Sequence, residues 1–329
     1  MYQPETYVIA LSFMIVTMLC WGSWANTMKL CPGYRFQLFY WDYVGGLVLG
    51  ALLWGLTLGS MGATGQPFFA DLSAMSSRSF LMALLGGITF NIANLLLVAA
   101  IDIAGLAVAF PVGIGLALVV GAVSSYLISP NGNPWLLFVG IALIAVAIVL
   151  DAGAYRLRER ERAATSRRGV LLSLAAGLLM GTFYPFVSKA MSGERPMGPY
   201  STAFVFSLGV LVCSVPVNYL FMRRPLDGGT SVSMGAYFAA PRSWHVWGLL
   251  GGLIWCTGAV LNFVASRSQI VGPAVSYSIG QGATMVSAAW GVFVWREFAT
   301  APPASKRLVA LMFLFFILGL TSVALAPLF

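Results

Sequence analysis

The sequence has 329 residues, of which 59% are hydrophobic and 9% are charged, and its mean hydropathy is +0.88. Soluble proteins carry about a quarter charged residues, so these proportions exclude a soluble domain and require the lipid bilayer around most of the chain. The net charge of +8 does not indicate nucleic-acid binding, because the Lys and Arg residues lie in short connections between apolar runs. The four cysteines have no paired spacing, which indicates neither a disulfide framework nor a metal site.

Apolar runs long enough to cross a bilayer occur ten times along the chain. A hydrocarbon core about 30 Å thick needs about 20 apolar residues per helix. Such runs cover residues 6–29, 36–59, 79–101, 104–128, 134–152, 169–191, 199–221, 244–266, 271–295 and 306–327. Continuous runs favour helices over the short alternating segments of a membrane barrel. The sequence therefore predicts an all-α membrane protein with ten transmembrane helices.

The basic residues predict how these helices are oriented. When the connections are numbered alternately, 14 of the 18 Lys and Arg residues fall on one side, and Arg78, Lys189, Arg195 and Arg267 fall on the other. Cytoplasmic loops carry an excess of Lys and Arg, so the first side is expected to be cytoplasmic. We therefore expect a multi-pass protein of the bacterial inner membrane whose N- and C-termini both lie outside.

An Arg-rich connection at residues 154–168 divides the chain near its middle. It separates a first five-helix repeat, residues 1–153, from a second five-helix repeat, residues 169–329. The simpler interpretation of this basic cytoplasmic connection is that it sets the topology and joins the two halves. The alternative is a regulatory site for a lipid or a protein.

The two halves share short motifs in the same order. Residues 105–115, GLAVAFPVGIG, match residues 272–282, GPAVSYSIGQG, at five positions. Upstream, Leu-Leu-Gly-Gly at residues 84–87 recurs at residues 249–252. With five helices in each half, the second half enters the membrane in the opposite orientation, and the repeats are inverted. Inverted repeats are typical of secondary transporters.

Motifs along nearly the whole chain resemble one transporter superfamily. They are Met1-Tyr2, Gly22-Ser23-Trp24, Asp42-Tyr43, Gly86-Gly87-Ile88 with Asn94-Leu95, Pro185 after Phe183, Gly258 with Leu261-Asn262-Phe263, and Trp290-Gly291-Val292 followed by Glu297. The pattern is similar to the drug/metabolite transporter superfamily of ten-helix, five-plus-five permeases. Within it, the chain resembles the branch that holds the plant ureide permeases and the bacterial glucose/rhamnose uptake proteins. This resemblance implies transport of a small solute.

Asp42 is the main candidate for coupling transport to protons. A charge inside a membrane helix is costly, so each such residue is a functional candidate. Asp42 lies near the start of the second predicted helix, within Tyr40-Trp41-Asp42-Tyr43. In one interpretation it faces a cavity and accepts the coupling proton. In the other, Tyr40, Trp41 and Tyr43 form an interfacial belt and Asp42 lies in headgroup water.

Other ionisable residues favour structural roles. Lys29 and Lys189 end equivalent helices and are expected to extend to the membrane surface. Asp151 and Glu297 lie among arginines at cytoplasmic helix ends, which favours salt bridges. His245 is the only histidine, and one histidine builds neither a metal site nor a proton relay, so an interfacial position is expected. The sequence thus predicts no catalytic residue, no metal and no cofactor, with a proton or cation gradient as the driving force.

Neutral polar and aromatic residues in the predicted helices are the candidates for binding the solute. They are Trp24, Asn26, Asn91, Asn94, Tyr184, Asn262, Tyr277 and Gln281. In the functional interpretation, amides and hydroxyls bind a neutral polar solute, and Trp24 or Tyr277 stacks on its flat face. In the structural alternative, the same groups form hydrogen bonds between helices.

The sequence therefore predicts a secondary transporter, a proton symporter, that imports a small neutral polar solute by alternating access. A sugar or a ureide- or nucleobase-like compound fits the candidate residues. A metabolite or drug exporter of the same superfamily is the alternative. An intramembrane enzyme or a receptor is the alternative from another class, although the sequence offers no nucleophile, carboxylate pair or metal set for an enzyme. The expected partners are the solute and membrane lipid, not nucleic acid, and the chain is expected to act as a monomer or homodimer.

Overall fold

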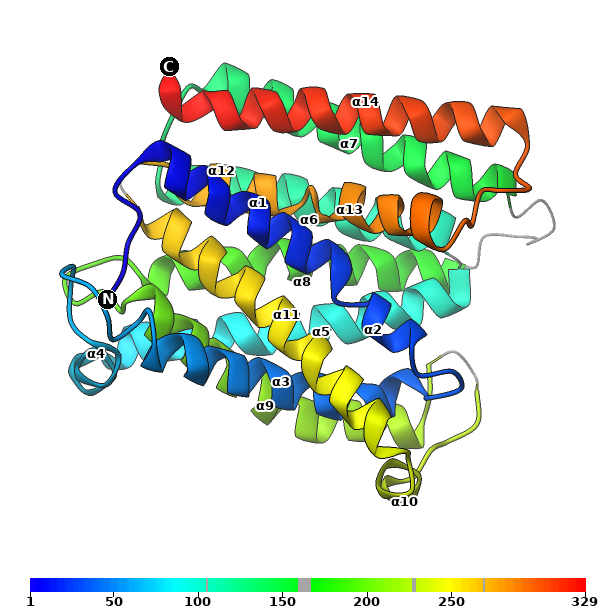
Figure 1. Cartoon of the computed structure of the whole chain (residues 1–329), viewed down its shortest axis with the longest axis horizontal. Coiled ribbons are helices and arrows are strands. Elements are labelled where there is room, and N and C mark those ends of the chain that lie inside the picture. The colour runs from blue at the N-terminus through cyan, green and yellow to red at the C-terminus, as the bar shows by residue number, and fades with distance from the viewer. Residues whose placement is uncertain (105, 159–166, 227–228, 269) are drawn as a thin grey trace.

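A computed structural model describes residues 1–329 except residues 105, 159–166, 227–228 and 269. Its described residues form helices and connecting segments, without strands, which confirms the predicted all-α class. The connection 154–168 and the motif 105–115 lie partly outside the described residues. The long helices pack against one another in a bundle, and some of them cross the others obliquely (Figure 1).

The helices follow one another with short connections. In chain order they are α1 (Tyr7–Ser23), α2 (Asn26–Lys29), α3 (Phe36–Leu56), α4 (Phe68–Ala74), α5 (Ser77–Ala104), α6 (Leu106–Ile128), α7 (Pro134–Arg158), α8 (Arg167–Ala190), α9 (Pro199–Arg223), α10 (Met234–Phe238), α11 (Arg242–Arg267), α12 (Pro273–Gly280), α13 (Ala283–Ala289), the π-helix η1 (Trp290–Val294), α14 (Pro303–Leu325) and the 3-10 helix η2 (Ala326–Leu328).

Eight helical segments within the described residues are long and apolar enough to cross a membrane. They are Tyr7–Lys29, Phe36–Leu56, Ser77–Ile101, Pro134–Arg158, Arg167–Ala190, Pro199–Arg223, Arg242–Arg267 and Pro303–Leu328. Val112–Ile128, within α6, is a shorter apolar helix. The chain is thus a multi-pass membrane protein by length and composition, and the count of ten crossings stays a prediction.

The expected helix 271–295 is divided into α12, α13 and η1. Every residue of α12 is buried, so this short helix lies inside the bundle. The break follows Gly280, and Gly282 precedes α13. A Cβ on Gly280 would lie 2.7 Å from the Trp21 ring, and one on Gly282 would lie 2.5 Å from the Met18 sulfur. Glycine weakens a helix interior, and at both positions α1 packs too closely to admit a side chain.

Helices α3 and α11 cross with their backbones in contact. A Cβ on Gly46 would lie 2.1 Å from the Leu249 carbonyl oxygen, and one on Gly252 would lie 2.0 Å from the Tyr43 carbonyl oxygen. Glycine on both helices is therefore required for this approach, as is common in membrane bundles.

Helices α5 and α9 cross in the same way. A Cβ on Gly87 would lie 2.0 Å from the Phe206 carbonyl oxygen, and one on Gly209 would lie 2.3 Å from the Leu84 carbonyl oxygen. In both crossings, the first leucine of the repeated Leu-Leu-Gly-Gly motif supplies the carbonyl and its last glycine meets the facing helix. The repeated motif thus makes one kind of contact twice.

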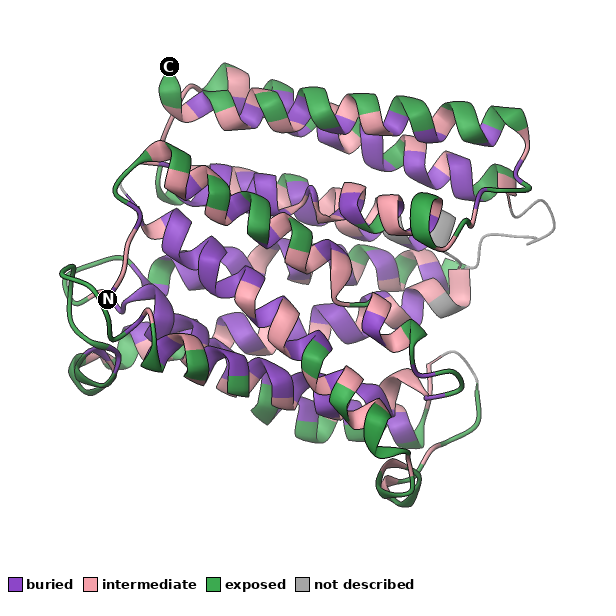
Figure 2. Ribbon diagram, viewed as in Figure 1, coloured by how far each residue is buried: buried purple, intermediate pink, exposed green. Residues whose placement is uncertain are grey.

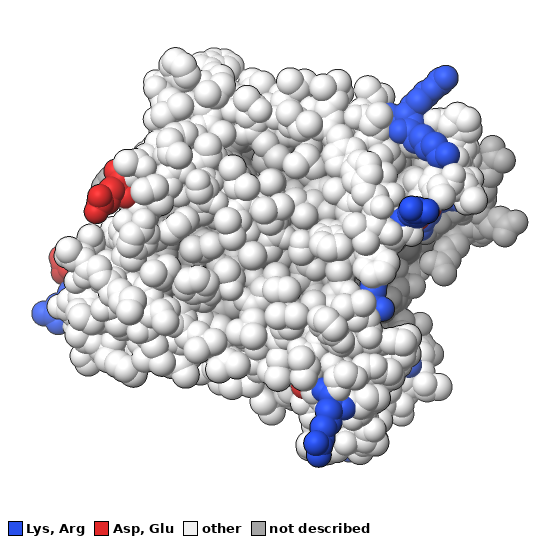
Figure 3. All heavy atoms as spheres, viewed as in Figure 1, with Lys and Arg blue, Asp and Glu red and all other residues white. Residues whose placement is uncertain are grey.

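The two ends of the bundle differ in charge. Both chain termini and α4 lie at one end, on the left of Figure 1, which we name the terminal end. The N-terminus of α14 and the end of α2 lie at the opposite end (Figure 1), where most of the Lys and Arg residues visible in Figure 3 gather. We name this the basic end. Figure 2 shows exposed residues on the outward faces of the outer helices and buried residues between the helices.

Candidate functional site

The Asp42 carboxylate lies within α3 and is buried, with 4% of the residue exposed. His245 Nδ1 on α11 lies 2.9 Å from Oδ2. The Tyr237 hydroxyl on α10 donates to Oδ1 at 2.7 Å, and the Tyr34 hydroxyl, before α3, donates to Oδ2 at 3.2 Å. We name these four residues the Asp42 group. It joins α3, α10 and α11 near the basic end through one carboxylate.

A glycine on α11, Gly248, makes space for the Asp42 side chain. Gly248 lies three residues after His245, so both face α3 from the same side of the helix. A Cβ on Gly248 would lie 2.4 Å from the Asp42 Cβ. Burial, and then the neighbouring Asp42 carboxylate, raise the pKa of the Tyr34 and Tyr237 hydroxyls, so both remain protonated donors.

The structure contradicts one of the two interpretations of Asp42 and corrects the expected position of His245. Tyr40 and Tyr43 are fully buried, so they do not form an interfacial belt, and Asp42 does not lie in headgroup water. The His245 side chain is 23% exposed and contacts Asp42, so its position is not merely interfacial. Sequence reasoning missed the contact between His245 and Asp42, and Gly248, three residues after His245, is the local signal for close packing on this face.

Glu297 forms a second charged cluster at the basic end. Its Oε1 lies 2.7 Å from Lys29 Nζ, and its Oε2 lies 3.1 Å from Arg158 Nη1. The Tyr155 hydroxyl also donates to Oε2 at 3.1 Å. Burial raises the pKa of Glu297, but the hydrogen bond and charge of Lys29, with the hydrogen bonds of Tyr155 and Arg158, outweigh it and lower the pKa. We name these four residues the Glu297 cluster, which joins α2, α7 and the segment after η1.

The predicted salt bridge of Glu297 is confirmed, and Lys29 forms it. Lys29 Nζ also lies 4.8 Å from the centre of the Trp295 ring. Trp295 Nε1 donates to Asn26 Oδ1 at 2.6 Å. Asn26, a solute candidate from the sequence, is therefore hydrogen-bonded to Trp295, which packs against the Glu297 cluster at the basic end. Asp151 is buried, and its Oδ1 has no hydrogen-bond partner among the described residues.

Asn91 and Asn94 on α5 lie together against Tyr40 of α3. The Tyr40 hydroxyl donates to Asn91 Oδ1 at 2.8 Å, and Asn94 Nδ2 donates to the Tyr40 hydroxyl at 3.3 Å. Ser214 Oγ on α9 donates to Asn91 Oδ1 at 2.9 Å. The two asparagines thus share one side of α5, and Tyr40 and Ser214 are their partners.

Spare hydrogen-bonding capacity remains beside this pair of asparagines. Within the part of the chain that the structure describes, the buried atoms Asn91 Nδ2 and Tyr43 OH have no hydrogen-bond partner. The Trp24 ring lies 4.6 Å from the Tyr43 ring, which lies 5.2 Å from the Tyr40 ring. We name Trp24, Tyr40, Tyr43, Asn91 and Asn94 the Tyr40–Asn91 group.

The candidates from the second half are bound to one another or to backbone. The Tyr184 hydroxyl donates to Asn262 Oδ1, and Asn262 Nδ2 donates to the Ser276 carbonyl at 2.9 Å. The Tyr277 hydroxyl donates to the Ala117 carbonyl at 3.1 Å. These bonds join α8, α11, α12 and α6. Gln281 lies half-buried at the break between α12 and α13.

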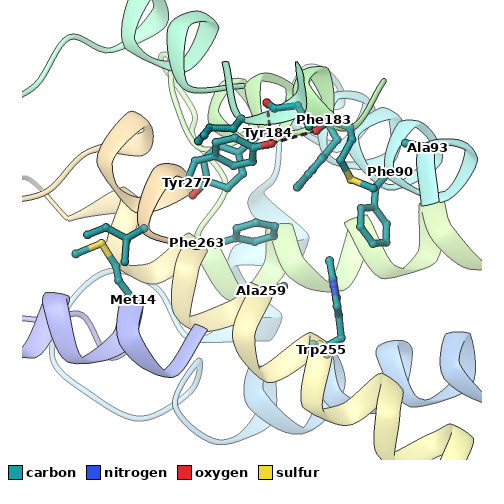
Figure 4. Packing of buried hydrophobic residues seen from close by; sticks show 14 of the residues in the cluster. Met14, Phe90, Ala93, Phe183, Tyr184, Trp255, Ala259, Phe263 and Tyr277 are labelled. Atoms are coloured by element: carbon teal, nitrogen blue, oxygen red, sulfur yellow. Dashed lines mark hydrogen bonds between the residues drawn. The ribbon is translucent and has the colours of Figure 1, made fainter. Parts of the chain in front are cut away.

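Aromatic side chains from several helices pack together inside the bundle, among them Phe90, Phe183 and Trp255 (Figure 4). The Phe90 and Trp255 rings are 4.4 Å apart, and the Trp255 and Phe206 rings are stacked at 6.0 Å. The Phe183 ring lies 5.4 Å from Phe90 and 6.2 Å from Tyr277. The centre of the bundle is therefore closed by packed rings from α5, α8, α9, α11 and α12.

Two cavities open at the terminal end. One, of about 670 Å³, is lined by residues that include Asp71, Arg195 and Arg267. The other, of about 360 Å³, is lined by residues that include Asn131, Ser188 and, again, Arg267. Arg267 thus lies between the two cavities. The terminal end thus contains two cavities, whereas hydrogen bonds and ion pairs hold the helices together at the basic end.

Known proteins resemble this chain over most of its length. A family model described as sugar transport protein matches residues 13–326. Ureide permease 1 of Arabidopsis thaliana is 23% identical, with 97% of each chain covered. An L-rhamnose-proton symporter of Citrobacter koseri is 27% identical over 52% of this chain and 50% of its own. One solved crystal structure has 14% identity and a TM-score of 0.66 over 95% of this chain and 98% of its own, so it shares the fold.

Proposed function

Because this chain belongs to the sugar transport protein family, we propose that it is a proton-coupled secondary transporter that imports a small neutral polar solute. A sugar or a ureide-like compound is the proposed substrate class, in keeping with the names of its relatives. The observation that carries the proposal is the buried Asp42 carboxylate, bound to His245 at the closed end of the bundle. This family assignment agrees with the branch that the sequence motifs resemble.

Asp42 is the proposed site of the coupling proton. Histidine changes its charge near neutral pH, and a carboxylate beside it can exchange a proton with it. Protonation of Asp42 removes the negative charge that faces His245 and the hydroxyls of Tyr34 and Tyr237. Loss of that charge weakens the contacts that hold α10 and α11 against α3. Proton binding is thereby linked to opening of the basic end.

The Tyr40–Asn91 group is the proposed solute site. Each buried polar atom without a partner costs about 1–3 kcal/mol, so Tyr43 OH and Asn91 Nδ2 would be stabilised by hydroxyl or carbonyl groups of a solute. Trp24 offers an aromatic face for the solute to stack on. Tyr43 directly follows Asp42 on α3, so movement of this turn reaches both the proton site and the solute site.

Ten transmembrane helices in two inverted repeats are the proposed architecture. In this proposal, residues 1–153 and 169–329 are the repeats and 154–168 connects them, with α12, α13 and η1 together as the ninth crossing. The two glycine crossings support the proposal, because the Leu-Leu-Gly-Gly motif makes the same backbone contact between α3 and α11 as between α5 and α9. The packing of α1 on α11 likewise corresponds to that of α8 on α5.

The basic end is proposed to be cytoplasmic, with both termini outside, because Lys and Arg favour the cytoplasmic side of membrane proteins. In this orientation, the cavities of the terminal end open outward while the Asp42 group and the Glu297 cluster close the inward path. The conformation is then closed on the cytoplasmic side. Alternating access requires these contacts at the basic end to break when the solute is released.

Reconstituted vesicles test the proposed function directly. We expect purified protein to be stabilised against heat by a sugar or a ureide, and vesicles to accumulate that solute when a pH gradient, acid outside, is imposed. An uncoupler should abolish the accumulation. Failure of every sugar and ureide to stabilise the protein or to be taken up would overturn the substrate class. If expression in cells lowers the content of the solute instead of raising it, the chain is an exporter.

A further inference from the structure

A groove between η1 and α14 lies on the side of the bundle near the basic end. It has a volume of about 500 Å³ and is walled by Val292, Phe293, Val309 and Phe313. Phe293 is 69% exposed, and its ring lies 6.0 Å from that of Phe313. Exposed phenylalanine on membrane-spanning helices faces lipid tails, so the walls of this groove match an acyl chain.

Two cations lie at the mouth of this groove. Arg296 and Lys306 are both exposed and both line it, and none of its lining residues carries a carboxylate. Lys306 Nζ donates to the Ala299 carbonyl at 2.9 Å, which fixes its head beside the groove. The nearby Glu297 side chain turns to Lys29 and Arg158 instead.

The backbone at Arg296 is held in an unfavourable conformation. Its φ is +51°, and among the described residues it alone, apart from glycines, has a positive φ. A side chain in this left-handed region costs free energy, and it persists where its surroundings fix it. Two backbone hydrogen bonds fix the residues before and after Arg296. Trp295 N donates to the Trp290 carbonyl, and Glu297 N donates to the Gly291 carbonyl. The chain thus presents Arg296 outward while Glu297 points into its cluster.

We propose that this groove binds an anionic phospholipid, with an acyl chain between Phe293 and Phe313 and the phosphate at Arg296 and Lys306. The charge of the mouth complements a lipid phosphate, which binds Arg through paired hydrogen bonds. The groove also lies at the end of the bundle where Lys and Arg gather, as expected for the leaflet that holds anionic lipid. A free phosphate would make no contact with the apolar walls of the groove, so a lipid, which carries both a phosphate and acyl chains, is the proposed occupant.

Bound lipid also affects the closed basic end. Arg296 precedes Glu297, so a phosphate on Arg296 restrains the segment that places Glu297 against Lys29 and Arg158. The lipid therefore stabilises the conformation in which the Glu297 cluster is formed. This site does not depend on which solute is transported.

Native mass spectrometry of the purified full-length protein tests the proposal with phosphatidylglycerol and, as the neutral lipid, phosphatidylcholine. We expect phosphatidylglycerol to be retained in preference. The double variant R296Q/K306Q should weaken its binding about fivefold for each cation removed. R307Q is the matched control, because Arg307 is exposed beside Lys306 but does not line the groove. Equal binding by the double variant and the wild type, or an equal loss in R307Q, would overturn the proposal.

A second variant tests the apolar walls separately. A310W fills the groove with a ring from an exposed position on α14 and leaves both cations in place. We expect it to lose phosphatidylglycerol while its melting temperature without added lipid stays that of the wild type. Displacement of the lipid by inorganic phosphate, or undiminished binding by a folded A310W, would show that the groove does not hold the acyl chain.

Discussion

The two ends of the molecule hold their charged residues in different ways. At the basic end, Asp42 and Glu297 each accept hydrogen bonds from several other segments of the chain. At the terminal end, Asp71 and Arg267 line a cavity of about 670 Å³, and Asp71 accepts a backbone hydrogen bond from Gly198. Charges that pair across helices hold those helices together, whereas charges around a cavity remain accessible to a solute.

This difference locates the contacts that must change during transport. If the bundle opens alternately at its two ends, opening of the basic end must separate Asp42 from α10 and α11, and Glu297 from α2 and α7. In the proposed mechanism, the same groups decide both the stability of the closed state and the response to protons. Variants at the basic end should alter transport, and matched variants elsewhere should not.

Substitution of Asp42 is expected to have the largest effect. The change D42N keeps an acceptor oxygen for one of the two tyrosine hydroxyls and removes the group that binds the proton. We expect uptake driven by a pH gradient to fall to the level of leakage, measured as the initial rate in vesicles. E194Q, which alters an exposed carboxylate at the terminal end, is the control and should retain uptake. Unchanged proton dependence in D42N would remove Asp42 from the coupling mechanism.

The sequence alone identified Asp42 as a functional candidate, but it did not identify the residues that contact its carboxylate. An isolated carboxylate in an apolar run stands out, because a membrane helix rarely tolerates one. His245 lies 203 residues away, and no local pattern links the two. An interfacial belt at Tyr40 and Tyr43 was one of two interpretations, because aromatic residues near a helix end are often interfacial, and only the tertiary packing of other helices against α3 shows that they lie inside.

The same contrast holds for the fold. The apolar runs and the basic connections follow from composition alone, since lipid thickness and charge act on each segment by itself. The break after Gly280 depends on how closely α1 approaches α12, which is a tertiary contact. Among the solute candidates, Asn91 and Asn94 stayed together because their spacing is local, whereas the bond between Asn26 and Trp295 joins distant segments.

Gly248 tests the close packing behind the Asp42 group. The change G248A would place a methyl group 2.4 Å from the Asp42 Cβ, which forces α11 away from α3. Overpacking of this kind costs about 1–3 kcal/mol, so we expect a lower melting temperature and weaker uptake. G45A is the matched control, because its Cβ would lie 3.4 Å from a leucine methyl group, an ordinary contact. A G248A protein as stable and active as G45A would contradict this packing.

Glu297 tests whether the basic end is held closed by its cluster. E297Q removes the charge that binds Lys29 and Arg158, whose side chains are 44% and 24% exposed. A partly exposed pair is worth up to about 1 kcal/mol, so the open state should become about fivefold more populated. Cys31 is a natural probe, because it is buried at this end and burial raises the pKa of its thiol.

Labelling of Cys31 by a maleimide should therefore be faster in E297Q than in the wild type. K189Q, which removes an exposed lysine at the end of α8, is the control and should leave the rate unchanged. Equal labelling of all three proteins would mean that the Glu297 cluster does not hold the basic end closed.

The smallest expected effect is a pH dependence that comes from the same carboxylate. The pKa of Glu297 in the folded protein lies below its ordinary value of 4.5, because Lys29, Tyr155 and Arg158 favour the charged form. A lowered pKa gives stability that is fully present above pH 4.5 and is lost as the pH falls through the folded pKa. The melting temperature of the wild type should exceed that of E297Q at pH 7, and the gap should shrink as the pH falls below 4.5. A gap that stays constant over this range would show that the charge of Glu297 does not stabilise the closed basic end.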